Sequence, residues 1–524
     1  MGKNTFRLAG QDWPKVTWWK MKGMRFVYLT LWAAMITSAT NGYDGSLMNG
    51  LESIKSWNVS YNNPHGGTLG LLAAAMSIGS MLAIPVVPYI ADILGRRAGV
   101  VVGCVIMICG VVMVSIGYHI ALFVVGRMVL GFGLGISQEC SPLLVIELVH
   151  PQHRATYSSI YNALWYVGSL IGAGVALGTN HIQHSAWAWR VPCLLQGVPS
   201  ICQLIFIWMV PESPRWLISK GRLEQAKKVL AYVHAQGDED DALVNVEFEE
   251  IQQTIALEKE YTRNAWTEFL STKGNRHRTL ILVCIGFFSQ WSGNGIVSYF
   301  LPQVLKLIGI TNSNTQLTIN LVLSAVNCVS AIGICFWVEY FGRRKLFLTS
   351  SISMLLCYIA TTIALALYAE GPNGNPAAGH TVIAFIFLYY IAYNIGYSGL
   401  LVSYSSEILP YHLRAKGLTL MFFCVDLSLW FNQYVNPIAI EAIQWKYYIV
   451  YCVFLVFEIA IVYFFFVETK ETPLEEIVKI FDGEQAILGG AIASEKVQQL
   501  ALGGDDTIRV DKERAVASSV EIRG

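Results

Sequence analysis

The chain has 524 residues, of which 54% are hydrophobic and only 14% are charged, and its formal net charge is zero. A soluble domain carries about 25% charged residues, so this composition excludes an ordinary soluble protein. Zero net charge also argues against a nucleic-acid partner.

Twelve apolar runs of about 20 residues follow one another along the chain, and each is long enough to cross roughly 30 Å of hydrocarbon as an α-helix. The first run is too long for the core of a signal peptide, so we expect it to remain as a helix. The pattern predicts an all-α membrane protein with twelve transmembrane helices. We expect these helices at residues 26–48, 68–91, 98–117, 120–143, 157–178, 190–210, 279–305, 317–338, 346–368, 381–404, 417–440 and 446–467.

Lysine and arginine are concentrated on one side of the predicted helices. They lie in the amino-terminal segment, in the loops that follow even-numbered helices, and in the long middle connection. The excess of positive charge in these segments predicts that both termini are cytoplasmic. We expect a cytoplasmic segment 1–25, a first bundle 26–210, a helical linker 211–278, a second bundle 279–467 and a cytoplasmic tail 468–524, largely disordered after about residue 478.

Two smaller features agree with this topology. The sequon Asn58-Val59-Ser60 falls in the first outside loop, which predicts glycosylation at Asn58. All eleven cysteines lie within predicted helices and form no C-x-x-C pair, so we interpret them as buried packing residues. We expect no metal and no cofactor.

The chain repeats itself. ADILGRR at 91–97 corresponds to VEYFGRR at 338–344, and the seven-residue spacing from Glu147 to Arg154 recurs from Glu407 to Arg414. The repeat predicts two pseudo-symmetric six-helix bundles in the same orientation, with a ligand site at their interface near the middle of the membrane.

These motifs resemble the sugar-porter branch of the major facilitator superfamily over about residues 25–480. The resemblance rests on the two GRR motifs, GRMVLGFGLG (126–135), PESPRWL (211–217) and ETKETPLEEI (468–477). Within that branch, QWSGNG, YSSEILPYHLRAKG (404–417) and FNQYVNP (431–437) are similar to fungal lactose and cellodextrin permeases. The resemblance implies the major facilitator fold and a transporter rather than an enzyme.

Charged residues of both repeats lie at the cytoplasmic ends of the predicted helices. We expect them to form a network that ties the two halves together while the site faces outward. The alternative is that the basic residues only set the topology. The first half contributes Asp92, Arg96, Arg97, Glu147 and Arg154, and the second contributes Glu339, Arg343, Arg344, Glu407 and Arg414.

The polar residues of FFSQWSGNGIVSYFLP (287–302) interrupt an apolar segment. Gln290 lies roughly 16 Å from the inner end of its predicted helix, and Asn294 is expected one turn later on the same face. Amides at comparable depth on other helices would complete a ring that can donate to and accept from a polyhydroxylated ligand. This ring adds Asn327, Asn394 and Asn432, and Trp291, Tyr299 and Trp430 offer apolar faces. The alternative is that these amides join helices to one another.

The resemblance adds residue roles to this site. It implies that Gln290, Asn327 and Asn162 contact the sugar. The family pattern QQ-x-x-G-x-N is SQWSGNG here, and Val402 stands where many hexose porters have Trp. These two departures favour a ligand larger than a monosaccharide.

Two charged residues fall inside predicted helices. Asp44 and Arg127 would each cost roughly 3 kcal/mol near the centre of a lone helix, and both lie in the outer part of the bundle, where they could pair. Proton symporters of the resembled family have Asp and Arg at the matching positions, which implies proton coupling. The alternative is a static structural ion pair.

The sequence therefore predicts a plasma-membrane transporter that carries a disaccharide such as lactose or cellobiose together with a proton. We expect a monomer whose partners are the sugar, the proton and the lipid bilayer. Two alternatives remain. One is a hexose or pentose porter, either a symporter or a facilitator, and the other is a sugar sensor with the same fold.

Overall fold

The structure is a computed structural model that describes residues 5–8, 11–182, 185–261, 265–335, 341–370, 376–409, 411–470 and 480–482. Glu339 of the expected cytoplasmic network and the tail from residue 483 onward lie outside the described residues.

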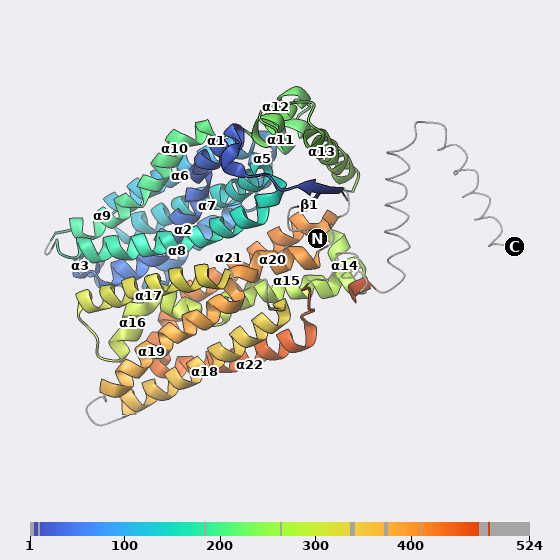
Figure 1. Cartoon of the computed structure of the whole chain (residues 1–524). Coiled ribbons are helices and arrows are strands. Elements are labelled where there is room, and N and C mark those ends of the chain that lie inside the picture. Colours follow the sequence, from blue (N-terminus) through green and yellow to red (C-terminus); the bar gives the residue numbers. More distant parts are fainter. Residues whose placement is uncertain are drawn as a thin grey trace.

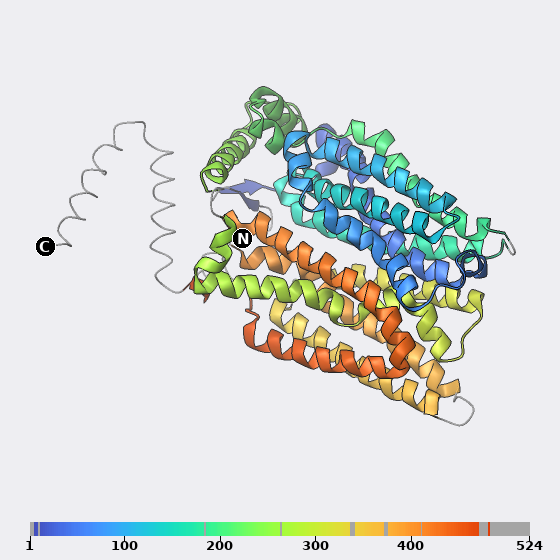
Figure 2. The same ribbon diagram turned by 180° about the vertical axis from the view of Figure 1, so that it is seen from behind.

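Two helical bundles lie side by side (Figures 1 and 2). The first is formed by the blue-to-green part of the chain in Figure 1, and several of its membrane helices are built from two shorter pieces. Its helices are α1 (Lys22–Thr30) with α2 (Trp32–Ser53), α4 (Gly66–Ala83) with α5 (Val87–Ile93), α6 (Arg96–Ile116), α7 (Ile120–Leu148), α8 (Arg154–Thr179), and α9 (Trp187–Leu195) with α10 (Gly197–Phe206). The short α3 (Lys55–Ser60) lies in the first outer loop.

The second bundle repeats this arrangement in the yellow-green to red part of the chain. Helix α15 begins at Lys273, six residues before the expected start, so less of the chain belongs to the linker than predicted. The helices are α15 (Lys273–Trp291) with α16 (Asn294–Leu307), α17 (Ser313–Cys335), α18 (Arg343–Glu370), α19 (Pro376–Tyr393) with the π-helical η6 (Asn394–Ser398) and α20 (Gly399–Ile408), α21 (Tyr411–Ile443), and α22 (Tyr447–Phe465).

Ten stretches of the described residues are long and apolar enough to span a membrane. One of them, Lys416–Phe465, contains two successive helices, α21 and α22. Helices α1 and α2 complete the set of twelve, and their mean hydropathy is low because α2 contains polar residues such as Asn41, Asp44 and Asn49. The predicted twelve-helix, two-bundle fold is confirmed.

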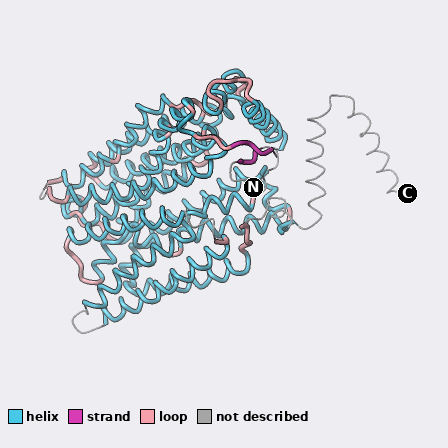
Figure 3. Tube along the Cα trace, viewed as in Figure 1, coloured by secondary structure: helices cyan, strands magenta, loops and turns pink. Residues whose placement is uncertain are grey.

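Shorter elements gather at one end of the bundles, on the right of Figure 1, which is the end that the sequence predicts to be cytoplasmic. The linker forms α11 (Pro214–Ser219), α12 (Leu223–His234), α13 (Ala242–Tyr261) and α14 (Ala265–Ser271). Near the amino terminus, β1 (Thr5–Leu8) pairs antiparallel with β2 (Gln11–Pro14), which are the two strands in Figure 3. The 3-10 turns are η1 (Trp18–Lys20), η2 (Pro151–His153), η3 (Ile207–Met209) and η7 (Gln444–Lys446).

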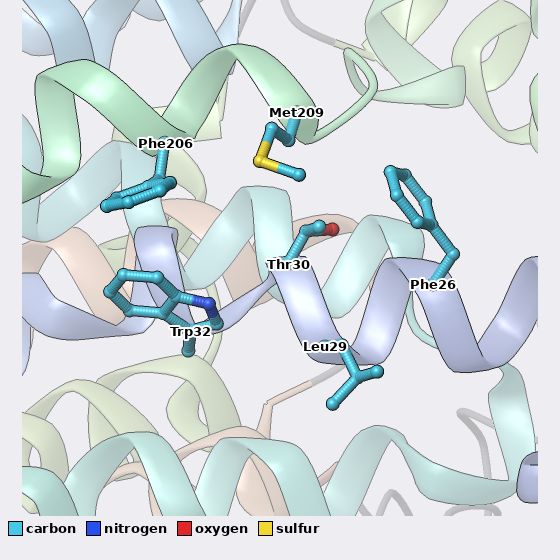
Figure 4. A pocket seen from close by; sticks show the side chains of 6 residues that line it. All are labelled: Phe26, Leu29, Thr30, Trp32, Phe206 and Met209. Atoms are coloured by element: carbon cyan, nitrogen blue, oxygen red, sulfur yellow. The ribbon is translucent and has the colours of Figure 1, made fainter.

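One apolar pocket of about 310 Å³ lies between α1, α2 and α10 (Figure 4). It is lined by Phe26, Leu29, Thr30, Trp32, Phe206 and Met209. A sugar needs many hydrogen-bonding partners, and this lining offers only the Thr30 hydroxyl and the Trp32 indole N–H. The pocket is therefore unsuited to a sugar, and the polar site must be sought between the bundles.

Candidate functional site

Asp44 and Arg127 form a buried ion pair between α2 and α7. The guanidinium donates to both carboxylate oxygens, from Nη1 to Oδ1 at 3.1 Å and from Nη2 to Oδ2 at 3.0 Å. The Gln196 amide donates a third hydrogen bond to Oδ1 at 2.8 Å. Asp44 is 3% exposed and Arg127 is 2% exposed. The carboxylate is thus held by three helices of the first bundle, since Gln196 lies at the junction of α9 and α10.

The seventh membrane helix is broken inside the polar stretch. Helix α15 ends at Trp291, and α16 begins at Asn294 after Gly293, whose φ of +107° lies in the left-handed region. The expectation that Asn294 follows Gln290 on one helix face is wrong, because the helix does not continue between them. The Asn294 amide instead donates to the Ser289 carbonyl at 3.1 Å, across the break.

Tyrosine hydroxyls from two other helices satisfy the carbonyl groups that the break releases. A backbone carbonyl without a partner is costly in a membrane protein, because no bulk water is present to bond it. Four hydroxyls of α18 and α19 fill this role. The bonds run from Tyr393 to Ser289 (2.8 Å), from Tyr389 to Ser292 (2.9 Å), from Tyr358 to Gly293 (2.7 Å) and from Tyr390 to Asn294 (3.1 Å).

Asn49 of the first bundle holds the outer piece of the same helix. Its amide nitrogen donates to the carbonyls of Val297 and Ser298 at 3.2 and 2.6 Å, and its oxygen accepts from the Leu301 N–H at 2.9 Å. These bonds surround Phe300, where the backbone of α16 is not helical. One buried side chain of α2 therefore compensates a kink in α16 across the interface between the bundles.

The predicted amides fall into two groups. Asn394 donates to Ser330 Oγ at 2.8 Å and to Asn327 Oδ1 at 3.5 Å, and its own oxygen accepts from the Tyr166 hydroxyl at 2.9 Å. Tyr166 belongs to α8 of the first bundle, so this group connects the two halves. The structure brings Asn327 and Asn394 together as part of a cross-interface cluster.

Gln290 and Asn432 form the second group. The Asn432 amide donates to the backbone carbonyl of Gln290 at 2.5 Å, while the half-buried Gln290 side chain forms no hydrogen bond with the described residues. The Trp291 ring packs against Phe431 and Phe454 and its N–H donates to a backbone carbonyl, so its faces contact protein. Gln290 retains free hydrogen-bonding capacity.

Asn162 and Asn58 stand apart from these groups. Asn162 is an exposed residue of α8 and forms no hydrogen bond with the described residues. The Asn58 amide donates to the backbone carbonyls of Glu52 and Ile54 at 2.8 and 3.2 Å. Because a glycosylated amide nitrogen keeps one N–H, a glycan on Asn58 would leave at most one of these two bonds.

The recorded hydrogen bonds between the bundles lie in the middle or outer half of their helices. Besides those of Asn49 and Tyr166, they join Asn320 to Ser46 (3.1 Å), Ser77 to Gln433 (2.6 Å), Ser169 to Ser324 (3.3 Å) and Asn180 to Asn314 (2.6 Å). Further out, a cavity of about 370 Å³ is lined by residues of both halves, among them Glu52, Gln303, Lys306 and Glu441. The two halves are therefore bonded together in the middle and at the end opposite the linker helices, which is the predicted outer side.

The charged motif residues of the first bundle bind partners in that bundle and at the start of the linker. Arg96 lies 3.3 Å from Glu147 and 3.6 Å from Asp92, and the Arg96 and Arg97 backbone N–H groups donate to Glu212. Because Glu212 belongs to the PESPRWL motif, the network binds the start of the linker to the end of the bundle.

Arg154 pairs with a residue outside the expected network. It pairs with Glu247 of α13 at 2.5 Å, and the other Glu247 oxygen is 2.7 Å from His234 of α12. His150 is buried beside them, with its ring centroid 5.1 Å from that of His234. This cluster docks the linker helices onto the first bundle.

The second bundle repeats the first network. Arg343 pairs with Glu407 at 3.2 Å, and its backbone N–H donates to Glu468 at 2.7 Å. Arg344 donates to the Tyr463 carbonyl. Glu468 thus takes the place of Glu212, because both acidic side chains bind the first turn of the helix that follows a GRR motif.

The ion pairs that the structure records for these motifs lie within one bundle or join it to the linker. The expected tie between the halves belongs to the state in which the site faces outward, and it stays a prediction.

Some of these partners were missed by the sequence analysis. Gln196 could have been found, because it is an amide inside an apolar run, whereas Asn49 lies one residue beyond the predicted helix 26–48. The tyrosines of YYIAYNIGY (389–397) are harder to recognise as hydrogen-bonding partners from the sequence, since tyrosine also packs well in apolar cores.

Comparison with known proteins agrees with this architecture. Residues 30–481 match the family described as "Sugar (and other) transporter". The chain is 30% identical over 490 residues to the MFS-type transporter oryC of Aspergillus oryzae, covering 89% of this chain and 88% of that protein. It is 27% identical over 470 residues to a high-affinity glucose transporter of Kluyveromyces lactis, covering 86% and 84%. These relatives are transporters, not enzymes.

Solved structures show the same fold. The proton:xylose symporter XylE bound to 6-bromo-6-deoxy-D-glucose superposes with a TM-score of 0.71 at 21% identity, covering 87% of this chain and 99% of that chain. A partially occluded inward-open form of XylE from E. coli also has a TM-score of 0.71, at 20% identity. At this identity the likeness establishes the fold alone, which is the major facilitator fold.

Proposed function

The chain belongs to the sugar transporter family of the major facilitator superfamily, and on that premise we propose that it carries a disaccharide such as lactose or cellobiose together with a proton. The observation that carries the proton coupling is the Asp44 carboxylate, buried and held by Arg127 and Gln196. A charge at this depth is expensive and marks a proton or ion path in membrane proteins.

The same helix provides a link between the proton and the motion. Asp44 and Asn49 both lie on α2, and Asn49 holds the outer piece of the broken helix α16. A proton on Asp44 would remove the charge that Arg127 binds, so α2 could move relative to α7. The Asn49 bonds to α16 would then break, and the outer side would open.

The sugar would bind where amides of the second half meet the Tyr166 hydroxyl of the first half. Gln290 has an unused side-chain amide, and the cluster of Asn327, Asn394 and Tyr166 spans the interface. Amides and hydroxyls both donate and accept, as sugar hydroxyl groups require. The departure of SQWSGNG from the family pattern and the Val402 side chain support a ligand larger than a hexose.

A hexose or pentose porter is the second candidate. It is supported by relatives described as glucose and hexose transporters, such as the high-affinity glucose transporter of Kluyveromyces lactis and a hexose transporter of Saccharomyces cerevisiae at 28% identity. Both candidates place a monomeric protein in the plasma membrane with cytoplasmic termini, as the lysine and arginine distribution supports.

Uptake measurements separate the two candidates. The chain would be expressed in a yeast strain without its own sugar carriers, which would be offered radiolabelled lactose, cellobiose, glucose and xylose at two external pH values. We expect accumulation of a disaccharide above its outside concentration, with alkalinisation of the medium. Uptake of glucose or xylose alone would favour the second candidate, and uptake without accumulation or pH dependence would contradict symport.

A further inference from the structure

The cavity of about 370 Å³ on the predicted outer side has no role in the mechanism described above. The first bundle contributes the end of α2, the short α3 and the start of α4 to its walls, and the second bundle contributes α16 and the end of α21. Side chains with hydrogen-bonding or charged groups form much of the lining. These include Glu52, His65, Gln303, Lys306, Glu441 and Gln444.

Glu52 brings a buried polar group without a partner to this cavity. Its side chain is 5% exposed, and its Oε1 atom forms no hydrogen bond with any described residue. The neighbouring Asn58 amide donates to the Glu52 backbone carbonyl and not to its carboxyl group. A buried polar group without a partner costs free energy, which a ligand hydroxyl in the cavity would recover. A carboxyl group can accept such a bond whether it is ionised or protonated.

The walls of the cavity meet across the interface between the bundles. Gly66 begins α4 with a φ of +49°, and a Cβ there would lie 2.7 Å from Oε2 of Glu441 on α21. Gln303 and Lys306 lie three residues apart on one face of α16, and both line the cavity. The Asn49 bonds hold this same helix against the first bundle. A ligand in the cavity would therefore contact both halves while the outer side is closed.

The chemistry of the lining suits a neutral polyhydroxylated molecule better than an ion. Two carboxyl groups, one ammonium group and one imidazole give no strong excess of one charge. The Gln303 and Gln444 amides both donate and accept, as sugar hydroxyl groups require. Leu69, Leu307 and Pro437 offer apolar contacts to the C–H groups of a sugar ring. The volume also falls in the range of about 300–1,000 Å³ that is usual for small-molecule sites.

We propose that this cavity is a second sugar-binding site, separate from the central amides, and that a sugar bound there keeps the outer side closed. Opening of the outer side separates the two walls, so such a ligand binds the closed arrangement more tightly and shifts the population toward it. A high sugar concentration outside the cell would thus slow the uptake of that same sugar. This inference rests on the proposed sugar transport and adds a site that limits it.

Uptake at rising sugar concentration tests the proposal. The yeast strain without its own carriers would be offered labelled lactose, cellobiose and glucose, each up to about a hundredfold of its KM. We expect the rate for a transported sugar to pass through a maximum and then to fall by about half. Glu52→Leu has a similar volume without a hydrogen-bonding group, so it should abolish the decline and change KM by less than about twofold. Glu52→Gln should retain part of the decline, because its amide can still bond a hydroxyl group.

Protection of an introduced cysteine measures binding in the cavity itself. His65→Cys places a thiol in the exposed part of the lining, where a membrane-impermeant reagent can reach it from outside. A transported sugar should slow this labelling, and Glu52→Leu should remove the protection. Gln290→Ala alters the central site and should leave the protecting concentration unchanged. Thr381→Cys is the matched control, because Thr381 is exposed on α19 and does not line the cavity.

A glycan on Asn58 is the competing occupant, because Asn58 lines the same cavity. Ser60→Ala removes the sequon without changing Asn58, and Ser60 is exposed. Both the decline of uptake and the protection should persist in Ser60→Ala. If they appeared only in this variant, the glycan would be the occupant in the unaltered chain, and the inference would be overturned.

The remaining outcomes separate this inference from the proposed function. Uptake that saturates without a decline, or a decline that persists in Glu52→Leu, would overturn the inference and leave transport intact. A higher protecting concentration in Gln290→Ala would assign the effect to the central site and would also overturn the inference. A chain that transports none of the sugars and gains no protection from them would overturn both.

Discussion

The polar centres of the two bundles are built differently. In the first bundle the buried groups are charged and pair with each other, as Asp44 does with Arg127. In the second bundle they are neutral hydroxyls and amides, and they satisfy a broken backbone between Trp291 and Asn294. Both solutions supply partners for most of the polar groups at these centres, and the first does so with a pair of opposite charges. The contrast suggests that the first half responds to the proton and the second half responds to the ligand.

The second bundle does hold one deeply buried carboxyl, and its environment sharpens the contrast. Glu458 on α22 accepts hydrogen bonds from the Tyr397 and Ser351 hydroxyls at 2.6 and 2.7 Å. No ion pair of Glu458 with a described residue is recorded, whereas Asp44 has a full guanidinium partner. The acid of this half is thus bound by hydroxyl groups, whereas the acid of the first half is bound by a guanidinium group.

Removal of one partner of the ion pair should have the largest effect. Arg127→Ala leaves the Asp44 carboxylate buried with Gln196 alone, which should destabilise the protein by roughly 3–5 kcal/mol. Asp44→Asn should fold but lose concentrative uptake, while exchange between equal pools survives. Thermal unfolding of purified protein and accumulation ratios measure the two effects. The double variant Asp44→Asn with Arg127→Ala should recover stability without recovering accumulation, and an Arg127→Ala protein of normal stability would contradict the assigned pair.

The break in the second half should be nearly as sensitive. Gly293 has a φ of +107°, and a Cβ there would lie 2.4 Å from the Tyr358 hydroxyl oxygen. Gly293→Ala should therefore lower the free energy of unfolding by about 3 kcal/mol. Gly333→Ala is the matched control, because a Cβ at Gly333 meets nothing within 4 Å. If both variants unfold at the same temperature, the strained break is not essential.

Asn49 bonds the first half to the second, so its replacement should open the outer side. Asn49→Ala removes three hydrogen bonds to α16, with a net effect of about 2 kcal/mol. A cysteine introduced at Gln303, in the outer cavity, should then react at least tenfold faster with a membrane-impermeant thiol reagent. Ser53→Ala is the control, since that hydroxyl bonds only within its own helix. Equal labelling rates in the two variants would argue against Asn49 as a gate residue.

The two amides of the broken helix should differ in their effect on transport. Gln290→Ala should raise KM about tenfold, which corresponds to roughly 1.4 kcal/mol of lost binding, because the ligand loses its hydrogen bonds to this amide. The fold should keep its stability, since the Gln290 side chain bonds no other described residue. Asn294→Ala should lower the Tm and leave KM within about twofold, since its amide bonds the Ser289 carbonyl. Both variants are tested by uptake kinetics, with surface expression measured in parallel. An unchanged KM in Gln290→Ala for every sugar would place the ligand elsewhere.

The stability of the first bundle should also decrease in acid, and this is the smallest of the predicted effects. Burial, followed by the charge of His234, lowers the pKa of His150 to about 3. His153 and Arg154 act in the same direction, while Glu247 opposes them. Because His150 is neutral when folded and has a normal pKa of about 6.5 when unfolded, its stabilising contribution is complete above pH 6.5 and is lost as the pH falls from there toward 3.

The loss should amount to about 1 kcal/mol between pH 7.5 and pH 6. Tm measured at these two pH values checks the expected loss, and His150→Gln should make Tm depend less on pH. His181→Gln, at an exposed position of an outer loop, should leave it unchanged. Burial also raises the pKa of the Glu247 carboxyl, but the charges of His234 and Arg154 outweigh it and lower the net value to about 2. Its contribution is therefore lost only below pH 4.5, outside this window.

The sequence alone determined the twelve helices, the two repeats and the choice of Asp44, Arg127 and Gln290 as candidates. These features depend on the length of contiguous apolar runs, on repeated motifs, and on polar residues inside those runs, all of which are local. A charge or an amide in a membrane helix is conspicuous because hydrocarbon makes it costly wherever it points.

Only the tertiary structure decided which groups meet. Sequence periodicity placed Asn294 on one face with Gln290, but the left-handed Gly293 breaks the helix between them, and Tyr358, Tyr389, Tyr390 and Tyr393 complete the exposed backbone. Arg154 likewise bonds Glu247, which is 93 residues away in the chain. Such partners depend on how separate helices pack and on where a backbone departs from regular geometry, and no local pattern records either.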